Sequence, residues 1–153
     1  MIASIKFLLS LFFVFILSSF SFGQGSESFT NLPTNSSSTY MDRSWTGDDG
    51  VIWTAKGAST DQTINGKAIC WGTSGTRIVT SPTYSNGIKT LTFKYVKAHT
   101  GNGTRYLEVY VNAEQKGSTI TVSPTSEVIE TYSLNIDFNG DGDFGIPGST
   151  ADA

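Results

Sequence analysis

The stretch Asn86-Gly-Ile-Lys-Thr-Leu-Thr-Phe-Lys-Tyr95 joins a turn dipeptide to a run of alternating apolar and polar residues. Asn-Gly favours the left-handed backbone of a tight hairpin turn. After it, every second residue from Leu91 to Tyr95 is apolar, so these side chains share one face of an extended chain. The stretch therefore predicts a β-strand with one buried face.

The same alternation recurs on both sides of this strand. After the turn dipeptide Asn102-Gly103, the residues Leu107, Val109 and Val111 alternate with polar or tyrosine side chains. Other short runs predict strands at Ser28–Thr30, Val51–Ala55, Lys67–Trp71, Arg77–Thr80, Ile120–Val122 and Tyr132–Ile136. No segment has an apolar period long enough for a helix, so we expect an all-β fold, an antiparallel β-sandwich. Its single predicted core contains Trp53, Phe93, Leu107, Val109, Val111, Leu134 and Ile136.

The N-terminal residues have the features of an export leader. Lys6 precedes an apolar run from Phe7 to Phe20, and small residues stand at Ser21 and Gly23. The run is short for a membrane span, and a signal peptide of residues 1–23 is the expectation. We accordingly expect residues 24–136 to form the β-sandwich and residues 137–153 to form a Gly- and Asp-rich tail, either a calcium loop or disordered. The protein would be secreted or held at the cell surface, without a membrane span after leader removal.

Composition narrows the classes of function. The 153 residues include 10 Lys and Arg against 13 Asp and Glu, which gives a net charge of −3. Nucleic-acid binding by bulk charge is therefore not expected. Cys70 is the single cysteine, so neither an intrachain disulfide nor a cysteine-rich zinc site can form.

Several segments resemble a known family. They are Glu27-Ser-Phe29, Ser44-Trp-Thr-Gly-Asp-Asp-Gly-Val-Ile-Trp53, Asp61-Gln-Thr-Ile-Asn-Gly-Lys-Ala-Ile69, and Ser81-Pro-Thr-Tyr84 ahead of the Leu91–Tyr95 strand. Together they look like a jelly-roll accessory module of secreted bacterial proteins, similar in architecture to carbohydrate-binding and cleaved-adhesin domains. Such modules accompany nucleases, proteases and adhesins exported by the type IX route. The resemblance implies a noncatalytic binding or accessory domain of a larger exported protein, with a neighbouring catalytic domain as one possible partner.

The end of the chain departs from that resemblance. Members of this kind usually continue with a further strand that bears an acidic pair, whereas here a Gly-rich stretch, 140–149, follows the Tyr132–Ile136 strand. We therefore expect a C-terminally truncated copy that lacks its last strand.

Three groups of residues are candidates for ligand or metal binding. Trp45, Asp48 and Asp49 combine an indole ring with carboxylates, which suits a carbohydrate, although Asp48-Asp49-Gly50 is also ordinary turn chemistry. Tyr106 and Tyr110 share a strand face and would form a flat platform for a glycan or a protein partner, unless a loop covers them.

The third group is a candidate for calcium. Asp137, Asn139, Asp141 and Asp143 place alternate oxygen ligands around Gly142, as calcium loops do. Gly148 stands where an EF-hand needs a bidentate Glu, so the choice lies between a looser structural calcium loop and a solvated acidic turn.

Candidate catalytic residues are few. His99 is the only histidine, and Cys70 lies in an apolar run typical of a small buried hydrophobe. We therefore expect a protein that is not an enzyme: a binding module for a carbohydrate or cell-surface ligand, or alternatively a structural or adhesin domain that binds protein.

Overall fold

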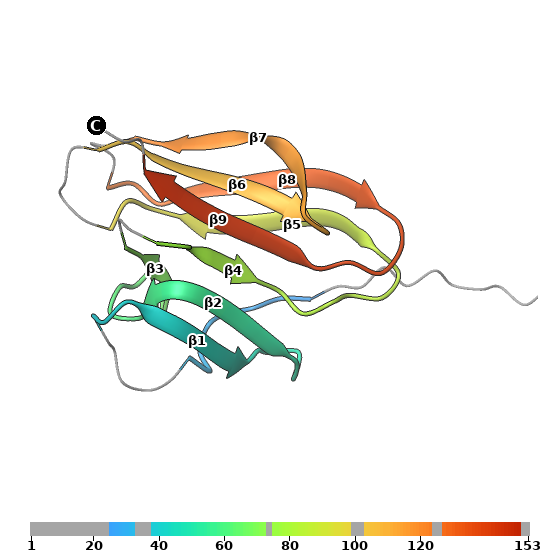
Figure 1. The fold of residues 1–153 in the computed structure, drawn as a ribbon, viewed down its shortest axis with the longest axis horizontal. Coiled ribbons are helices and arrows are strands. Elements are labelled where there is room, and N and C mark those ends of the chain that lie inside the picture. The colour runs from blue at the N-terminus through green and yellow to red at the C-terminus, as the bar shows by residue number, and fades with distance from the viewer. Residues whose placement is uncertain (1–24, 33–37, 73–74, 99–102, 124–126, 151–153) are drawn as a thin grey trace, which may run out of the picture.

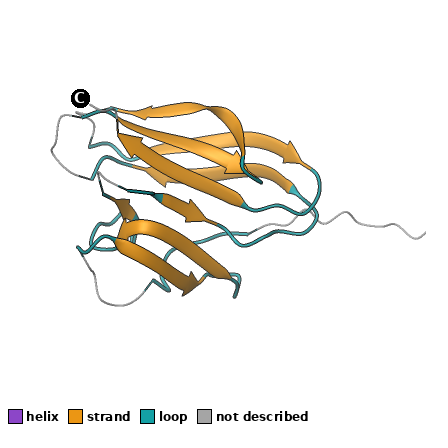
Figure 2. Cartoon of the chain, in the orientation of Figure 1, coloured by secondary structure: helices purple, strands orange, loops and turns teal. Residues whose placement is uncertain are grey.

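The computed structural model describes residues 25–32, 38–72, 75–98, 103–123 and 127–150. These residues form an all-β structure with antiparallel sheets, as the sequence predicted (Figure 2). The nine described strands are β1 (Met41–Thr46), β2 (Ile52–Ser59), β3 (Cys70–Trp71), β4 (Ile78–Thr80), β5 (Ile88–Tyr95), β6 (Arg105–Val111), β7 (Glu114–Val122), β8 (Glu130–Phe138) and β9 (Phe144–Thr150). The expected leader, residues 1–23, lies outside the described residues.

The strands form one large sheet and one small sheet. In the large sheet the order is β1-β2-β4-β9-β6-β7. The short strand β3 pairs with Ala58 and Ser59 at the end of β2, after the residues of β2 that pair with β4. The small sheet contains only β5 and β8. Half-buried side chains at alternate positions of β8 pack against the buried residues of the large sheet. The two sheets therefore face each other across apolar side chains, an arrangement consistent with the expected β-sandwich.

The apolar interior contains two clusters and not the single core that was predicted. The larger cluster includes Trp53, Val109 and Val111, and the smaller one consists of Leu107, Ile120 and Val122. Trp71, Phe93 and Tyr132 are half-buried and pack against both clusters. Leu134 and Ile136 of β8 are also half-buried, and both pack against the larger cluster.

The C-terminal segment corrects the predicted domain boundary. Phe144–Thr150 is not a tail but a strand in the interior of the large sheet, between β4 and β6 (Figure 1). Phe144 and Ile146 of this strand are buried in the larger cluster. The Gly-rich segment after β8 suggested a missing last strand. Since this segment is itself a strand with a partner on each side, it no longer supports that expectation.

The N-terminal part of the sheet also differs from the prediction. Ser28–Thr30 forms a turn and not a strand: Phe29 has φ +61°, and its carbonyl accepts a hydrogen bond from the Leu32 N–H at 3.1 Å. Among the described residues the first strand is β1, which was not predicted because only Trp45 of its six residues is buried. In the described residues no helix is long and apolar enough to cross a membrane.

Candidate functional site

The predicted ligand residue Trp45 is part of the core. Its side chain is only 4% exposed, and its ring stacks on Trp53 with 6.4 Å between centroids. Phe29 packs against the same ring at 5.9 Å. With both neighbours in place, the indole offers no face to a sugar ring, so this residue does not have the exposure that the prediction required.

Asp48 and Asp49 are exposed, but both carboxylates hold the backbone together. Asp48 Oδ2 accepts a hydrogen bond from the Ser28 N–H at 2.8 Å, which ties the N-terminal segment to the turn before β2. Asp49 Oδ1 accepts from the Val51 N–H at 3.2 Å, and its Oδ2 accepts from the Tyr84 hydroxyl at 3.2 Å. Burial, aided by this carboxylate, raises the pKa of Tyr84 above its ordinary value. The turn alternative accounts for these contacts.

Tyr106 and Tyr110 alternate with the buried residues of β6 and therefore share the outer face of the large sheet. Both are half-buried. The Tyr110 hydroxyl donates a hydrogen bond to Glu108 at 3.0 Å, which raises the pKa of the phenol. Glu108 also accepts from Thr119 of β7 at 3.0 Å. Carbohydrate binding on this face stays a prediction.

The predicted calcium residues are not gathered into a metal site in this structure. Asp137, Asn139 and Asp141 are exposed, and Asp143 is half-buried. Over the described ranges, no group of three or more His, Cys, Asp or Glu side chains is arranged to hold a metal ion. Asp137 Oδ2 instead accepts a hydrogen bond from Asn135 at 2.6 Å. Calcium binding therefore stays a prediction without a preformed ligand set.

Backbone pairing fixes the loop that carries these residues. Gly142 forms a β-bridge with Tyr84, with N–H to carbonyl distances of 2.8 and 3.0 Å in the two directions. The Asn112 side chain donates to the Asp141 carbonyl at 3.1 Å and accepts from the Asp143 N–H at 3.2 Å. These bonds lead the chain from β8 directly into β9.

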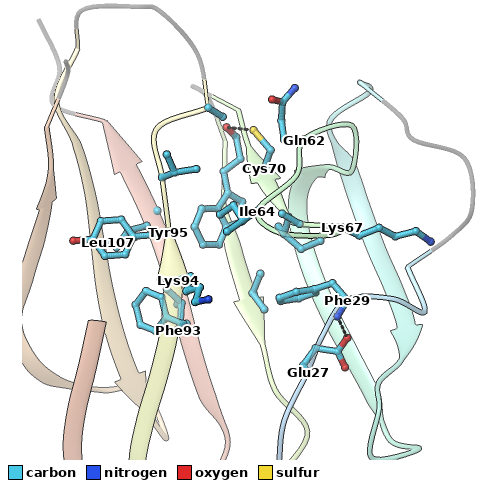
Figure 3. Close-up of a pocket in the computed structure, with 18 of the residues that line it drawn as sticks. Glu27, Phe29, Gln62, Ile64, Lys67, Cys70, Phe93, Lys94, Tyr95 and Leu107 are labelled. Carbon is cyan, nitrogen blue, oxygen red and sulfur yellow. Dashed lines mark hydrogen bonds between the residues drawn. The ribbon is translucent and has the colours of Figure 1, made fainter. Parts of the chain in front are cut away.

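A groove of about 980 Å³ lies between the two sheets. Of the predicted site residues only Tyr106 borders it, next to the inward-facing Leu107, although the Tyr106 side chain itself alternates to the outer face of β6. Figure 3 shows Phe93 and Tyr95 of β5 on one side of it and Phe29 and Lys67 on the opposite side. Val79, Phe144 and Ile146, from the neighbouring strands β4 and β9, also line it. The groove exists because the two-stranded small sheet covers only part of the inner face of the large sheet.

The N-terminal segment forms the wall opposite β5 and is held there by polar contacts. Glu27 accepts hydrogen bonds from the Phe29 N–H at 2.6 Å and from the Asp48 N–H at 3.0 Å. Lys67 donates to the carbonyls of Thr30 and Leu32 at 3.1 and 2.8 Å. These bonds pin the wall to the 47–49 turn and to the loop before β3.

Two of the groove's tryptophans have unsatisfied donors. The indole Nε1 atoms of Trp53 and Trp71 are buried, and within the described residues neither has a hydrogen-bond acceptor. A buried donor without an acceptor costs about 1–3 kcal/mol.

The reactive side chains of the groove are placed for structure. Burial raises the pKa of the Cys70 thiol above its ordinary value, so the sulfur is protonated at neutral pH and is a poor nucleophile. The Tyr40 hydroxyl lies 4.0 Å from this sulfur. Glu27 is occupied by the two backbone N–H groups described above. His99 lies outside the described residues. The described lining thus offers apolar surface, aromatic rings and cations, which suit binding.

The groove was not predicted from the sequence because its lining comes from segments far apart in the chain. Phe29, Ile64, Trp71, Phe93 and Tyr95 meet only after the sheets pack. The available signal was Ile64, an apolar residue directly before the turn dipeptide Asn65-Gly66 and outside every predicted strand, so that it has no strand of its own to pack in.

The chain was compared with family models, curated proteins and solved structures. No family model, curated protein or solved structure matches this chain.

Proposed function

We propose that this protein is a noncatalytic binding module that takes an elongated, largely apolar ligand into the groove between its sheets. The observation that carries the proposal is the groove itself, an open cavity at the upper end of the size range of small-molecule sites. Aromatic side chains line it, and its carboxylate and thiol are engaged in structural contacts.

The groove favours a protein or apolar ligand over the carbohydrate expected from the sequence. Sugar binding uses exposed aromatic faces next to available carboxylates, and the Trp45 ring and the Asp48 and Asp49 carboxylates are otherwise occupied. This proposal also includes two expectations from the sequence: that the N-terminal leader exports the protein, and that the chain resembles jelly-roll accessory modules. Their support is the sequence pattern.

An anionic aromatic dye tests the proposal directly. We expect 8-anilinonaphthalene-1-sulfonate to bind the folded protein at one saturable site, because its rings match the apolar lining and its sulfonate matches the surrounding cations. Replacing the groove residue Ile64 by Glu should raise the dissociation constant of the dye at least tenfold. The new carboxylate would make the site less favourable for the aromatic rings and would repel the sulfonate.

The control is Ile52→Glu, which changes an exposed residue of β2 outside the groove lining. Its dissociation constant should stay within about twofold of the parent value, and both variants should unfold in one thermal transition. Absence of saturable binding, or an equal loss in both variants, would rule out the groove as the ligand site.

A further inference from the structure

Strand β5 borders the groove with one of its backbone edges. Its only partner strand in the described structure is β8, which lies on its other side. The groove lining contains every residue from Thr90 to Ala98, including Thr92 and Lys94, whose side chains are exposed and not part of the interior. An unbroken run of lining residues means that the strand meets the groove with its main chain.

The geometry of antiparallel pairing leaves this edge with open hydrogen-bonding groups. Thr90 to Tyr95 pair residue by residue with Asn135 to Glu130 of β8. In such a ladder only every second residue exchanges both of its bonds with the partner strand. The residues between them direct their N–H and C=O groups to the opposite edge, which here is the groove.

The groove occupies the position that the next strand of the small sheet would take. β5 forms one side, and Phe29 of the N-terminal segment lies across from it (Figure 3). Val79 and Ile146 of the large sheet also line the groove. A strand added to β5 would lie about 4.8 Å from it and would place alternate side chains against the large sheet. This is the geometry of β-strand addition, in which main-chain bonds give affinity and alternate pockets give specificity.

Charge distinguishes the groove from the rest of the molecule. Among the described residues, the lining contains five of the chain's ten Lys and Arg but only one of its 13 Asp and Glu. Arg77 precedes β4 and Arg105 begins β6, so both lie beside the C-terminal end of β9. Lys97 follows the C-terminal end of β5. A ligand with acidic groups at this end complements the groove.

We propose that the groove binds an extended segment of a partner protein, which pairs antiparallel with the open edge of β5, turns alternate apolar side chains toward the large sheet and carries acidic residues at its N-terminal end. This inference rests on the proposed binding function and names its ligand class. The acidic end is N-terminal because an antiparallel partner starts where β5 ends, next to Lys97 and Arg105.

Synthetic octapeptides added to the full chain test the inference. The probe has two glutamates followed by alternating valine and threonine, and its counterpart has two lysines in place of the glutamates. We expect the acidic peptide to bind at least about tenfold more tightly. Its binding should also slow hydrogen exchange of alternate backbone amides between Thr90 and Tyr95, because a new strand would engage only those directed at the groove.

Two N-methylated versions of the acidic peptide provide a matched control. One is methylated on its odd residues and the other on its even residues, so both have the same composition, but only one loses the donors that face β5. We expect one version to lose binding and the other to retain it. In the protein, Lys97→Glu should weaken binding about tenfold or more, while Lys56→Glu on β2, outside the groove, should leave it within about twofold.

Other outcomes overturn the inference. Peptide binding that leaves the Thr90–Tyr95 amides unprotected, equal effects of the two methylated peptides, dimerisation of the protein through β5, or displacement of the dye by a glycan but by no peptide would each contradict strand addition. If the dye binds at the groove and no peptide does, the binding function stands and strand addition fails. If the dye does not bind at all, the proposed function itself fails.

Discussion

The three tryptophans show how neighbours decide the role of a residue. Trp45 and Trp53 lie on paired strands, directly opposite each other, and their rings stack on the inner face of the large sheet. Trp71 ends a two-residue strand, and its ring covers Gly148 of β9. All three indole N–H groups are buried without an acceptor in the described part of the chain. Their apolar surface, more than their hydrogen-bonding groups, therefore stabilises the fold.

Replacing Trp45 tests this at the residue scale. We expect Trp45→Ala to lower the free energy of unfolding by about 3–5 kcal/mol, because it leaves a cavity between Phe29 and Trp53. Trp45→Phe should cost less, since it retains part of the ring and removes an unsatisfied N–H. Urea denaturation measures both. A loss below about 1 kcal/mol for the alanine variant would show that the ring is not part of the core.

At the scale of single elements, β9 shows how a strand can escape a sequence pattern. Phe144-Gly-Ile-Pro-Gly-Ser-Thr150 contains two glycines and a proline, which are rare inside central strands. Here the glycines leave space for side chains of neighbouring strands. A Cβ at Gly145 would lie 2.7 Å from Ile78 Cδ1, and one at Gly148 would lie 2.9 Å from Trp71 Cε3. The two glycines that argue against a strand are therefore those that leave room for Ile78 of β4 and for the ring of Trp71 of β3.

The turn before β5 gives a second prediction at this scale. Gly87 has φ +93°, and a Cβ there would clash with the Phe138 carbonyl oxygen. Gly50 has φ +80° but open space around it. Gly50→Ala should therefore show only the strain of a left-handed backbone, about 1–2 kcal/mol. Gly87→Ala should cost at least about 2 kcal/mol more, because the ladder between β5 and β8 must also shift.

Thermal and urea unfolding of the two glycine variants make the comparison. Equal losses would mean that the Gly87 turn does not approach β8 as closely as the structure shows.

At the scale of the whole molecule, β9 unites two parts of the chain. The strands β1 to β4 come from the part of the chain before β5, and β6 and β7 come from the part after it. β9 pairs with β4 on one side and with β6 on the other, so the large sheet is continuous only through it. The groove lies where these parts meet, and its walls therefore depend on the complete sheet.

Alkaline pH should destabilise the whole fold through its tyrosines. Burial, with a 2.7 Å hydrogen bond to Glu130, raises the pKa of Tyr95 to about 12 from an ordinary value of 10.0. A neutral phenol is thus favoured in the folded state. This contribution is fully present below about pH 10 and is lost as the pH rises toward 12.

Urea midpoints measured between pH 8 and pH 12 test the tyrosine effect. We expect the midpoint to fall above pH 10, and to fall less steeply in Tyr95→Phe, which has no proton to lose. Because the lysines are the same in both proteins, the difference between the two curves reports the ionisation of Tyr95 and not that of lysines, which titrate in the same pH range. Parallel curves for the parent and the variant would contradict the raised pKa of Tyr95.

Local alternation predicted much of the strand content and little of the candidate site. Strands β2, β5, β6 and β8 were predicted in place because each alternates over five or more residues, and that pattern depends only on which face meets water. The polar strand β1 and the Gly-rich β9 were missed because their partners, and not their own composition, make them strands.

The sequence by itself determined that this chain folds into antiparallel sheets, since the apolar period of two is a local property of the polypeptide. Tertiary structure alone decided which aromatic residues are core, that β9 lies at the centre of the large sheet, and that a groove opens beside β5. Those features depend on contacts between residues such as Phe29, Trp71 and Phe93, which are distant in sequence and meet only when the two sheets pack.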